Sequence, residues 1–190
     1  MLDELIRKNR SYRRFHPDVI ITHNQLLQFV ELARLSGSAR NAQPLKYILS
    51  CDAEKNQKIF STLCWAAYLK DWGGPAVNER PSAYIIMLGD TEIATNYFCD
   101  HGIAAQSILL GAVAQGFGGC IIASIKREEL RCLLGIPERF EILQVIALGK
   151  PAEEVMIESM NENSDYKYWR DENGVHHVPK RSLQTIILPL

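Results

Sequence analysis

The segment from Asp100 to Ala123 constrains the fold more than any other part of the chain. Between Ile103 and Ala114, apolar residues fall on every side of a helical wheel. A helix of this kind either spans a membrane or lies buried at the centre of a protein. Its apolar part is shorter than the ~20 residues that a membrane span requires, and Gln106 and Ser107 interrupt it. We therefore expect a buried central helix.

The glycines at positions 116, 118 and 119 end this predicted helix, and the apolar run Cys120–Ala123 after them is typical of a short core strand. A dinucleotide-binding fingerprint needs the order strand, glycines, helix, which is the reverse of the order here. A P-loop needs Lys and then Ser or Thr after its second glycine, where this chain has Phe117 and Gly118. The cluster predicts a tight turn. A ligand would meet backbone amides after the strand, where we expect Ser124 to cap the next helix.

Length and composition favour one domain over residues 1–190, long enough to bury a sizeable core. A net charge of -1 argues against general attraction to nucleic acid or a membrane surface. The first ten residues contain no apolar run of signal-peptide length. The five cysteines are odd in number and none form a CxxC pair, which is typical of a reduced, cytoplasmic protein without a thiolate zinc site.

The rest of the sequence alternates predicted helices and strands. Thr22 to Gln25 form a capping box that opens a helix, and Asp52 caps a second helix that runs to Leu63. Gly135 and Pro137 end a third helix. Strands are predicted over 46–51, 83–88 and 142–148. The fold class is α/β, α+β in detail, with about four or five strands flanked by helices.

The C-terminal residues differ from the rest of the chain. Residues 151–178 are polar, and Asp171–Gly174 predicts a hairpin turn. The end of the chain is apolar instead, with five large aliphatic residues at positions 183, 186, 187, 188 and 190. Because these side chains have no obvious place in a single-domain core, we expect the tail 179–190 to pack on a partner subunit.

Two small basic clusters lie at opposite ends of the chain. The first contains Arg10, Ser11 and Arg13, and the second contains Lys180 and Arg181. Guanidinium forks match phosphate geometry and a serine hydroxyl adds a donor, so these residues are candidates for a phosphate site. The alternative is a solvated basic surface. The sequence leaves both interpretations open.

The loop between residues 36 and 44 is rich in small and amide residues. Ser38, Ala39 and Asn41 are candidates to hydrogen-bond a polar heterocycle or a polyol, and the alternative is an ordinary capped loop. His176 and His177 lack an acidic or cysteine companion at ligand spacing, so we expect no metal site. A GxSxG motif does not occur, and no Ser/His/Asp arrangement can be defended. No catalytic side chain is therefore assigned.

Six motifs, in this order, resemble the FMN-dependent nitroreductase family. They are Arg10–Phe15, Ser38–Pro44, Asp100–Gln106, Gly116–Gly118, Ala147–Pro151 and Pro179–Leu183. The resemblance covers nearly the whole chain and is closest to the shorter forms of the family. It implies a central mixed sheet flanked by helices, with a buried central helix. It also implies a domain-exchanged homodimer that carries two FMN sites at the subunit interface.

The resemblance also implies roles for individual residues. Arg10, Ser11, Lys180 and Arg181 would bind the phosphate and ribityl end of FMN, and Arg13 would lie near N1 and O2 of the isoalloxazine. The stretch matched by Ile122, Ala123 and Ser124 would bring a backbone amide to flavin N5. Ser38, Ala39 and Asn41 would reach the flavin of the other subunit.

Three residues depart from the family pattern: Asn9 replaces a frequent arginine, Leu45 a frequent tryptophan, and Ser107 a frequent asparagine. The implied activity is FMN-dependent oxidation of NAD(P)H, with ping-pong hydride transfer to a small-molecule acceptor such as a nitroaromatic or a quinone. Two alternatives stay open. One is a specialised enzyme of the same fold, acting in flavin fragmentation or reductive dehalogenation. The other is a flavin-binding module without useful turnover.

Overall fold

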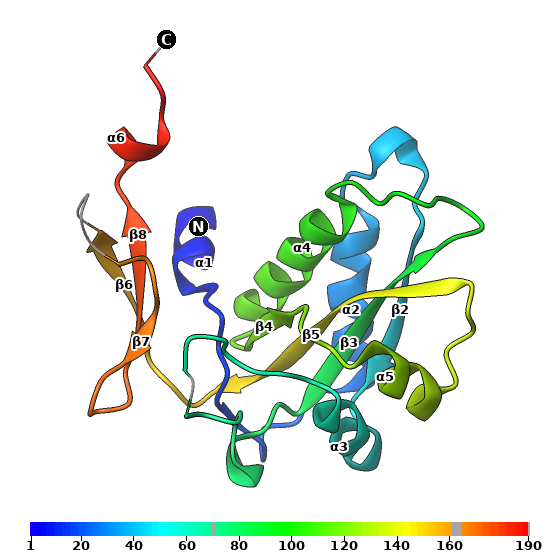
Figure 1. Cartoon of the computed structure of the whole chain (residues 1–190), viewed down its shortest axis with the longest axis horizontal. Helices are drawn as coiled ribbons and strands as arrows, with labels where there is room; N and C mark the ends of the chain where they lie inside the picture. Colours follow the sequence, from blue (N-terminus) through cyan, green and yellow to red (C-terminus); the bar gives the residue numbers. More distant parts are fainter. Residues whose placement is uncertain (70, 161–164, 190) are drawn as a thin grey trace.

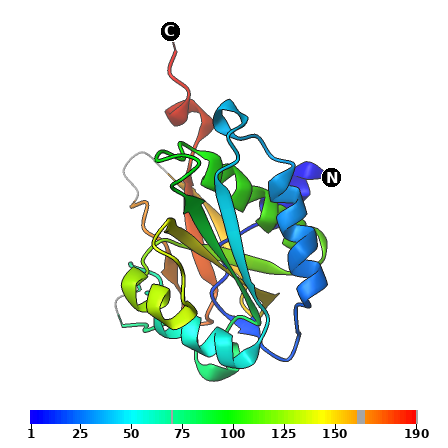
Figure 2. The same ribbon diagram turned by 90° about the vertical axis from the view of Figure 1, so that its right-hand side faces the viewer.

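A computed structural model describes residues 1–69, 71–160 and 165–189 of the chain, and in this part a five-stranded sheet lies between two pairs of helices (Figures 1 and 2). The strands are β1 (Phe15–His16), β2 (Leu45–Ser50), β3 (Ala83–Asp90), β4 (Gly118–Ile122) and β5 (Phe140–Pro151). Their order is β1-β5-β3-β2, and β4 also pairs with β5. Helices α2 (His23–Arg34) and α4 (Asp100–Ala114) cover one face, and α3 (Ala53–Ser61) and α5 (Arg127–Leu134) cover the other.

Strand β3 lies at the centre of the molecule, and all eight of its residues are buried. A strand with both faces covered has a continuous run of apolar residues, whereas a half-buried strand alternates apolar and polar residues. Residues 83–88 have the continuous pattern. Successive side chains point to opposite faces. Ile85 and Met87 therefore join the core beneath α2 and α4, whereas Tyr84 and Ile86 join the core beneath α3 and α5.

Helix α4 confirms the expected central helix, with one difference. Its buried residues include Ala104, Ile108 and Ala112, which pack on the sheet and on α2. Gly111 lies so close to Leu32 of α2 that a Cβ atom there would clash. The helix is not covered on every side, however, because Ile103 is 41% exposed and Gln106 is exposed as well. One side of α4, which includes Ile103 and Gln106, is therefore left uncovered by the chain's own helices.

Most of the predicted helix ends are confirmed, including the Asp52 cap of α3, and the one predicted at Ser124 is wrong. Thr22 and Gln25 form the capping box of α2, and Gly135 ends α5 in the left-handed conformation with φ 62°. Ser124 does not cap the next helix, since α5 begins at Arg127. The reason is that the carbonyl of Ser124 accepts a hydrogen bond from the Cys64 amide and Ile125 bridges to Leu63. These pairings keep the chain extended beyond the predicted start.

A smaller sheet lies apart from the main sheet, and the short N-terminal helix α1 (Leu2–Lys8) contacts α4 (Figure 1). The smaller sheet contains β6 (Val155–Met160), β7 (Trp169–Arg170) and β8 (His176–Arg181). Strand β6 is parallel to β8, whereas the β7–β8 pair is antiparallel and confirms the hairpin predicted around Gly174. The named strand pairs of the main sheet are all antiparallel, so the central sheet differs from the expected mixed sheet. Parallel and antiparallel pairs occur together in the smaller sheet instead.

The C-terminal tail leaves the body of the protein (Figure 1). After β8 it forms the single-turn helix α6 (Leu183–Ile186), and its apolar side chains stand in solvent. Leu183, Ile186, Ile187 and Leu188 are 58–79% exposed, and Leu190 lies outside the described residues. The short helices η1 (Ala39–Asn41) and η2 (Val77–Glu79) complete the elements. None of the helices in the described ranges has the length and apolar character that crossing a membrane requires.

Candidate functional site

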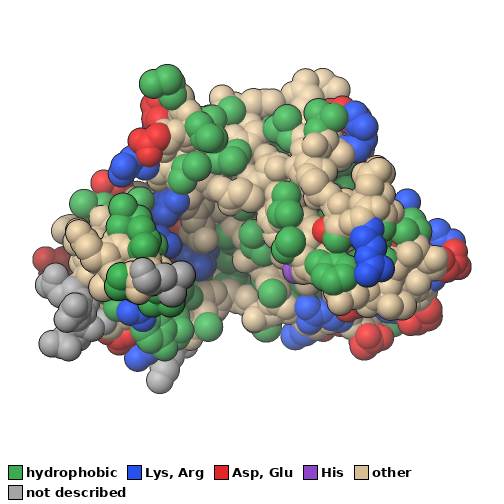
Figure 3. Space-filling view, turned by 90° about the horizontal axis from the view of Figure 1, so that it is seen from above, with side chains coloured by type: hydrophobic (Ala, Val, Ile, Leu, Met, Phe, Trp, Pro, Cys, Tyr) green, Lys and Arg blue, Asp and Glu red, His purple; other side chains and the backbone are tan. Residues whose placement is uncertain are grey.

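The two basic clusters from the ends of the chain meet in one cleft of about 300 Å³. Figure 3 shows Lys and Arg side chains lining a hollow beside the C-terminal part of the chain. The residues that line the cleft come from five parts of the chain: Asn9, Arg10, Ser11, Arg13, Gln106, Leu109, Ile121, Tyr168, His176, Val178 and Lys180. Arg181 follows Lys180 but does not line this cleft, since adjacent strand residues point to opposite faces.

The glycines after α4 position the N-terminal segment at the cleft. Ser11 bridges to Gly119, and the Tyr12 amide donates to the Gly119 carbonyl over 3.1 Å. A Cβ atom at Gly118 would clash with the Tyr12 ring, so this close approach requires glycine. The glycine cluster thus holds the basic segment against β4, in addition to forming the predicted turn. From the other side, the side-chain Nδ2 of Asn9 donates to Oε1 of Gln106 on α4 over 3.3 Å.

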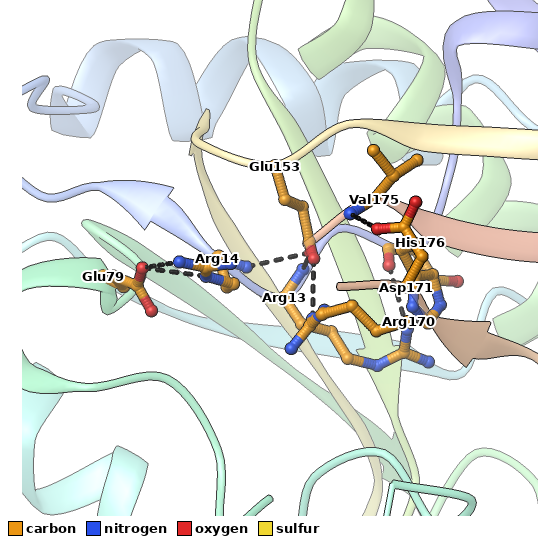
Figure 4. A network of polar contacts seen from close by, with 9 residues as sticks. Arg13, Arg14, Glu79, Glu153, Arg170, Asp171, Val175 and His176 are labelled. Carbon is orange, nitrogen blue, oxygen red and sulfur yellow. Dashed lines mark hydrogen bonds and ion pairs between the residues drawn. The ribbon is translucent and has the colours of Figure 1, made fainter. Parts of the chain in front are cut away.

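A buried carboxylate, Glu153, anchors the arginines beside the cleft (Figure 4). Its side chain is only 1% exposed and accepts hydrogen bonds from the backbone amides of Arg13 and Arg14. It also forms an ion pair with Arg170 at 2.8 Å, and Arg14 pairs separately with Glu79. A buried charge must be paired and hydrogen-bonded to be tolerated, and these partners satisfy that requirement. The sequence offered no signal for the role of Glu153.

The guanidinium of Arg13 is held in the cleft by three contacts. Its Nη1 donates to the Ser11 carbonyl over 3.1 Å and lies 3.3 Å from Nε2 of His176. Its carbon atom lies 4.9 Å from the centre of the Tyr168 ring, a distance at which a cation is attracted to the ring. The contacts to Tyr168 and His176 come from residues more than 150 positions away in the chain. They fix the positive charge at the wall of the cleft.

His176 and His177 are adjacent on β8 but face different surroundings. His176 is 1% exposed, and burial, followed by the charges of Arg13 and Arg170, lowers its pKa to about 4. It is therefore neutral at neutral pH. The Nδ1 of His177 lies 2.7 Å from Glu158, and this hydrogen bond raises its pKa. The sequence signal for this site is the period-two alternation of the strand, which places His176, Val178 and Lys180 on one face, whereas the pattern of the two histidines was considered above only for a metal site.

A second hollow of about 140 Å³ adjoins the cleft and contains the predicted stretch Ile122–Ser124. The two hollows share Arg13, Ile121 and Tyr168, so they lie side by side, and together they are called the depression below. Trp65 and Cys120 also line the second hollow. Burial raises the pKa of the Cys120 thiol to about 12, which leaves it protonated and a poor nucleophile.

Several buried donors around this depression lack partners among the described residues. They are Arg10 Nε, Trp65 Nε1 and His176 Nδ1. Unpaired buried polar atoms are uncommon in folded proteins and call for an explanation such as a ligand. Together with the cations Arg10, Arg13 and Lys180, they fit an anionic ligand that also carries a polar ring system. The donor set suits a flavin mononucleotide.

The loop with Ser38, Ala39 and Asn41 lies outside this depression. Ser38 Oγ donates to Asp100 Oδ2 over 2.6 Å, and the Ala39 amide donates to Asp100 Oδ1 over 2.9 Å. Asp100 is the first residue of α4 and is itself buried. Ser38 lines a different groove of about 700 Å³, between α2, β2 and the start of α4. One chain does not bring this loop to the basic cleft.

Comparison with known proteins identifies the family. The sequence pattern of the Nitroreductase family matches residues 6–150. The chain is 29% identical to an Archaeoglobus fulgidus protein inferred to be an NADH dehydrogenase/NAD(P)H nitroreductase, over 80% of this chain and 86% of that protein. It is 27% identical to the NADPH-flavin oxidoreductase of Vibrio harveyi, over 78% of this chain and 65% of that protein.

The fold agrees with this match. The solved structure of an FMN-dependent nitroreductase from Clostridium difficile R20291 superposes with a TM-score of 0.64 at 22% identity, over 79% of this chain and 87% of that one. The matched residues contain the whole N-terminal basic segment from Asn9 to Arg13, all of α4 and strands β1 to β4. The chain belongs to the nitroreductase family.

Proposed function

We propose that this protein is an FMN-dependent NAD(P)H oxidoreductase that reduces a small organic acceptor such as a nitroaromatic or a quinone. The observation that carries the proposal is the cleft in which Arg10, Ser11, Arg13 and Lys180 converge beside Ile121 of β4. The names of the Vibrio harveyi and Clostridium difficile relatives support NADPH as reductant and FMN as cofactor.

The chain's own residues would hold the cofactor from two sides. Arg10, Ser11 and Lys180 offer the donors that bind a phosphate, since charge-assisted hydrogen bonds to phosphate are among the strongest in proteins. Arg13 presents a fixed positive charge to the cleft, which suits the ring edge where negative charge develops on reduction. When bound, FMN supplies the hydride transfer between NAD(P)H and the acceptor.

No side-chain acid or base needs to be added to this scheme. The Cys120 thiol is protonated and the buried His176 is neutral, so neither is prepared as a nucleophile or as a cationic acid. The residues that line the second hollow include Trp65 and Tyr168, which contribute aromatic rings to walls that are otherwise mostly polar. Aromatic rings suit contact with a planar organic acceptor. The protein's part would be binding, orientation and electrostatics.

We also propose that the working unit is a homodimer. Two observations support it: the apolar tail stands in solvent, and the loop with Ser38 and Ala39 is turned away from the basic cleft of its own chain. In a dimer, Ser38, Ala39 and Asn41 of the partner subunit would complete each flavin site. The exposed strip around Ile103 on α4 would be covered at the same interface.

The absorption spectrum of the purified protein tests the proposal. We expect a yellow protein that carries about one noncovalent FMN per chain, as usual for a single built site, and that oxidises NADPH or NADH in air. A colourless protein that fails to bind added FMN would overturn the flavin assignment. A yellow protein that leaves both nicotinamides unoxidised would instead be a flavin-binding module, and the enzymatic part of the proposal would be wrong.

A further inference from the structure

Arg13, the cation proposed to face the flavin ring, is contacted by an imidazole from the opposite end of the chain. We propose that His176 is the positioning residue for Arg13. It is held as the Nδ1–H tautomer, so that its Nε2 accepts a hydrogen bond from the guanidinium and fixes it over Tyr168. The role in redox chemistry rests on the proposed function, whereas the tautomer and the contact do not.

The chemistry of the two groups determines which nitrogen carries the proton. A guanidinium has donors and no acceptor, and a neutral imidazole has one of each. Nη1 of Arg13 lies 3.3 Å from Nε2 of His176, so Nε2 must be the acceptor and the proton must lie on Nδ1. The low pKa of His176 agrees with this assignment, because a protonated ring would place two donors and two positive charges at this contact. Free histidine in water favours the other tautomer, which makes this assignment distinctive.

The backbone of both partners is fixed by two neighbouring residues. The carboxylate of Glu153 accepts from the Arg13 amide, and the carbonyl of Glu154 accepts from the His176 amide over 2.9 Å. Strand β8 is paired on both sides at this point, with Val155 opposite His176 on β6 and Arg170 opposite it on β7. Neither main chain is free to move away. The imidazole is therefore a rigid acceptor for the guanidinium.

The ring of Tyr168 completes the arrangement. Its centre lies 4.9 Å from the guanidinium carbon of Arg13 and 5.1 Å from the centre of the His176 ring. Tyr168 limits movement of the guanidinium toward the ring, and His176 limits rotation of its fork. Among the described residues, loss of the acceptor would leave the Ser11 carbonyl as the remaining partner that directs Nη1. The positive charge would then occupy several orientations in place of one.

The first test needs no variant. The full chain is labelled with 15N at histidine, and the ring-nitrogen shifts of His176 are read at neutral pH, with the signal assigned by its loss in His176→Gln. We expect a protonated Nδ1 and an unprotonated Nε2. An Nε2–H tautomer, or a doubly protonated ring, would overturn the inference. This result is independent of whether the protein binds FMN.

The second test compares His176→Leu, His176→Gln and the matched control His177→Leu, which changes the next residue on the other face of β8. In His176→Leu we expect reduced FMN to lose about tenfold in affinity relative to oxidised FMN, a downward shift of about 30 mV for a two-electron couple. His176→Gln keeps an acceptor near the Nε2 position and should restore most of this shift. His177→Leu should have the potential of the wild type.

The outcomes separate this inference from the proposed function. If the wild type binds no FMN, the flavin assignment fails while the tautomer measurement still tests the contact. If the wild type binds FMN and the potentials of His176→Leu and His177→Leu are equal, the positioning role is wrong and the flavin assignment stands. The positioning role is also wrong if the potential of His176→Gln is no higher than that of His176→Leu. A purely structural role needs only the volume of the side chain, so restoring a hydrogen-bond acceptor would then have no effect on the potential.

Discussion

The two regions proposed to contact the flavin are built in opposite ways. The basic cleft joins residues from both ends of the chain, and its central cation has a partner 163 positions away, at His176. The loop with Ser38 is local, and its polar groups are already used: Ser38 Oγ donates to Asp100 and accepts from the Gln43 amide over 2.9 Å. Within the described part of the chain, the cleft contains buried donors without partners, whereas Ser38 and Ala39 of the loop already donate to Asp100. One chain therefore assembles only one half of the proposed site.

The largest expected effect comes from deleting residues 183–190, which tests whether a second chain supplies the other half. Burial of a large aliphatic side chain contributes ~1.5–3 kcal/mol, and Leu183, Ile186, Ile187 and Leu188 are all exposed in the single chain. Their loss should weaken the dimer by several kcal/mol even after ordering costs. Dimer affinity and FMN retention should fall together, although Lys180 and Arg181 remain.

Sedimentation velocity and the absorbance of bound flavin measure this effect on the same sample. Replacement of the exposed Met156, which lies on β6 outside the tail, by Ala serves as a control for loss of an apolar surface residue. A wild-type protein that sediments as a flavin-loaded monomer at micromolar concentration would contradict the shared site. The cleft would then be sufficient by itself.

Low pH should lower the free energy of unfolding of the protein, because His176 at the cleft is buried in its neutral form. The unfolded chain takes up this proton near pH 6.5, whereas the folded protein does so only near pH 4. Between these values the unfolded state binds more protons, so the free energy of unfolding should fall as the pH falls. We therefore expect His176 to contribute about 3 kcal/mol to the free energy of unfolding above pH 6.5, and this contribution should be lost as the pH falls toward 4.

Urea unfolding from neutral pH down to about pH 4 measures this contribution. His176→Gln has no titrating ring, so the difference in slope between the wild type and this variant isolates the effect from that of the carboxylates. His177 should act with the opposite sign, because its raised pKa gives stability at low pH that is lost above its ordinary value. Equal slopes for the wild type and His176→Gln would contradict the buried neutral imidazole.

Arg13→Ala should lower the reduction potential of bound FMN. The loop that contains Ser38 should keep its hydrogen bonds in this variant. Removal of a charge-assisted hydrogen bond of ~1.5–3 kcal/mol corresponds to tens of millivolts. Arg14→Ala is the matched control, since Arg14 shares the Glu153 anchor through its amide but directs its side chain to Glu79. An unchanged potential in Arg13→Ala with full FMN occupancy would place Arg13 elsewhere in the site.

Local chemistry made much of the fold predictable from the sequence. The capping residue Thr22, the left-handed Gly135 and the continuous apolar strand β3 all act over a few residues. Ser124 was misread because its pairing partner, Cys64, lies 60 positions away. A residue with the right side chain for a cap adopts the extended conformation when a distant segment binds its carbonyl.

The site was predictable only in its residue types. Arg10, Ser11 and Arg13 have a phosphate-binding character that is visible in the sequence, and so has Lys180. The residues that orient them are not visible in this way. Glu153, Tyr168 and His176 belong to a polar segment without a motif, and they gain their roles because the smaller sheet folds back onto the N-terminus. A sequence pattern can therefore indicate which groups bind a ligand, whereas the tertiary contacts are needed to identify the groups that hold them in place.

The smallest expected effect is that of Ser38→Ala, and it is the sharpest test of the loop half. The substitution removes the Ser38 hydroxyl from Asp100, which keeps the Ala39 amide, so we expect a loss of about 1 kcal/mol in the free energy of unfolding. Ser38→Thr retains a hydroxyl and should recover most of it. The flavin potential should equal that of the wild type in both variants, because a hydroxyl already committed to Asp100 is not free to direct charge in the flavin. A potential shift as large as that of Arg13→Ala would show that the loop exchanges Asp100 for the ligand, and the contrast between the two halves would be wrong.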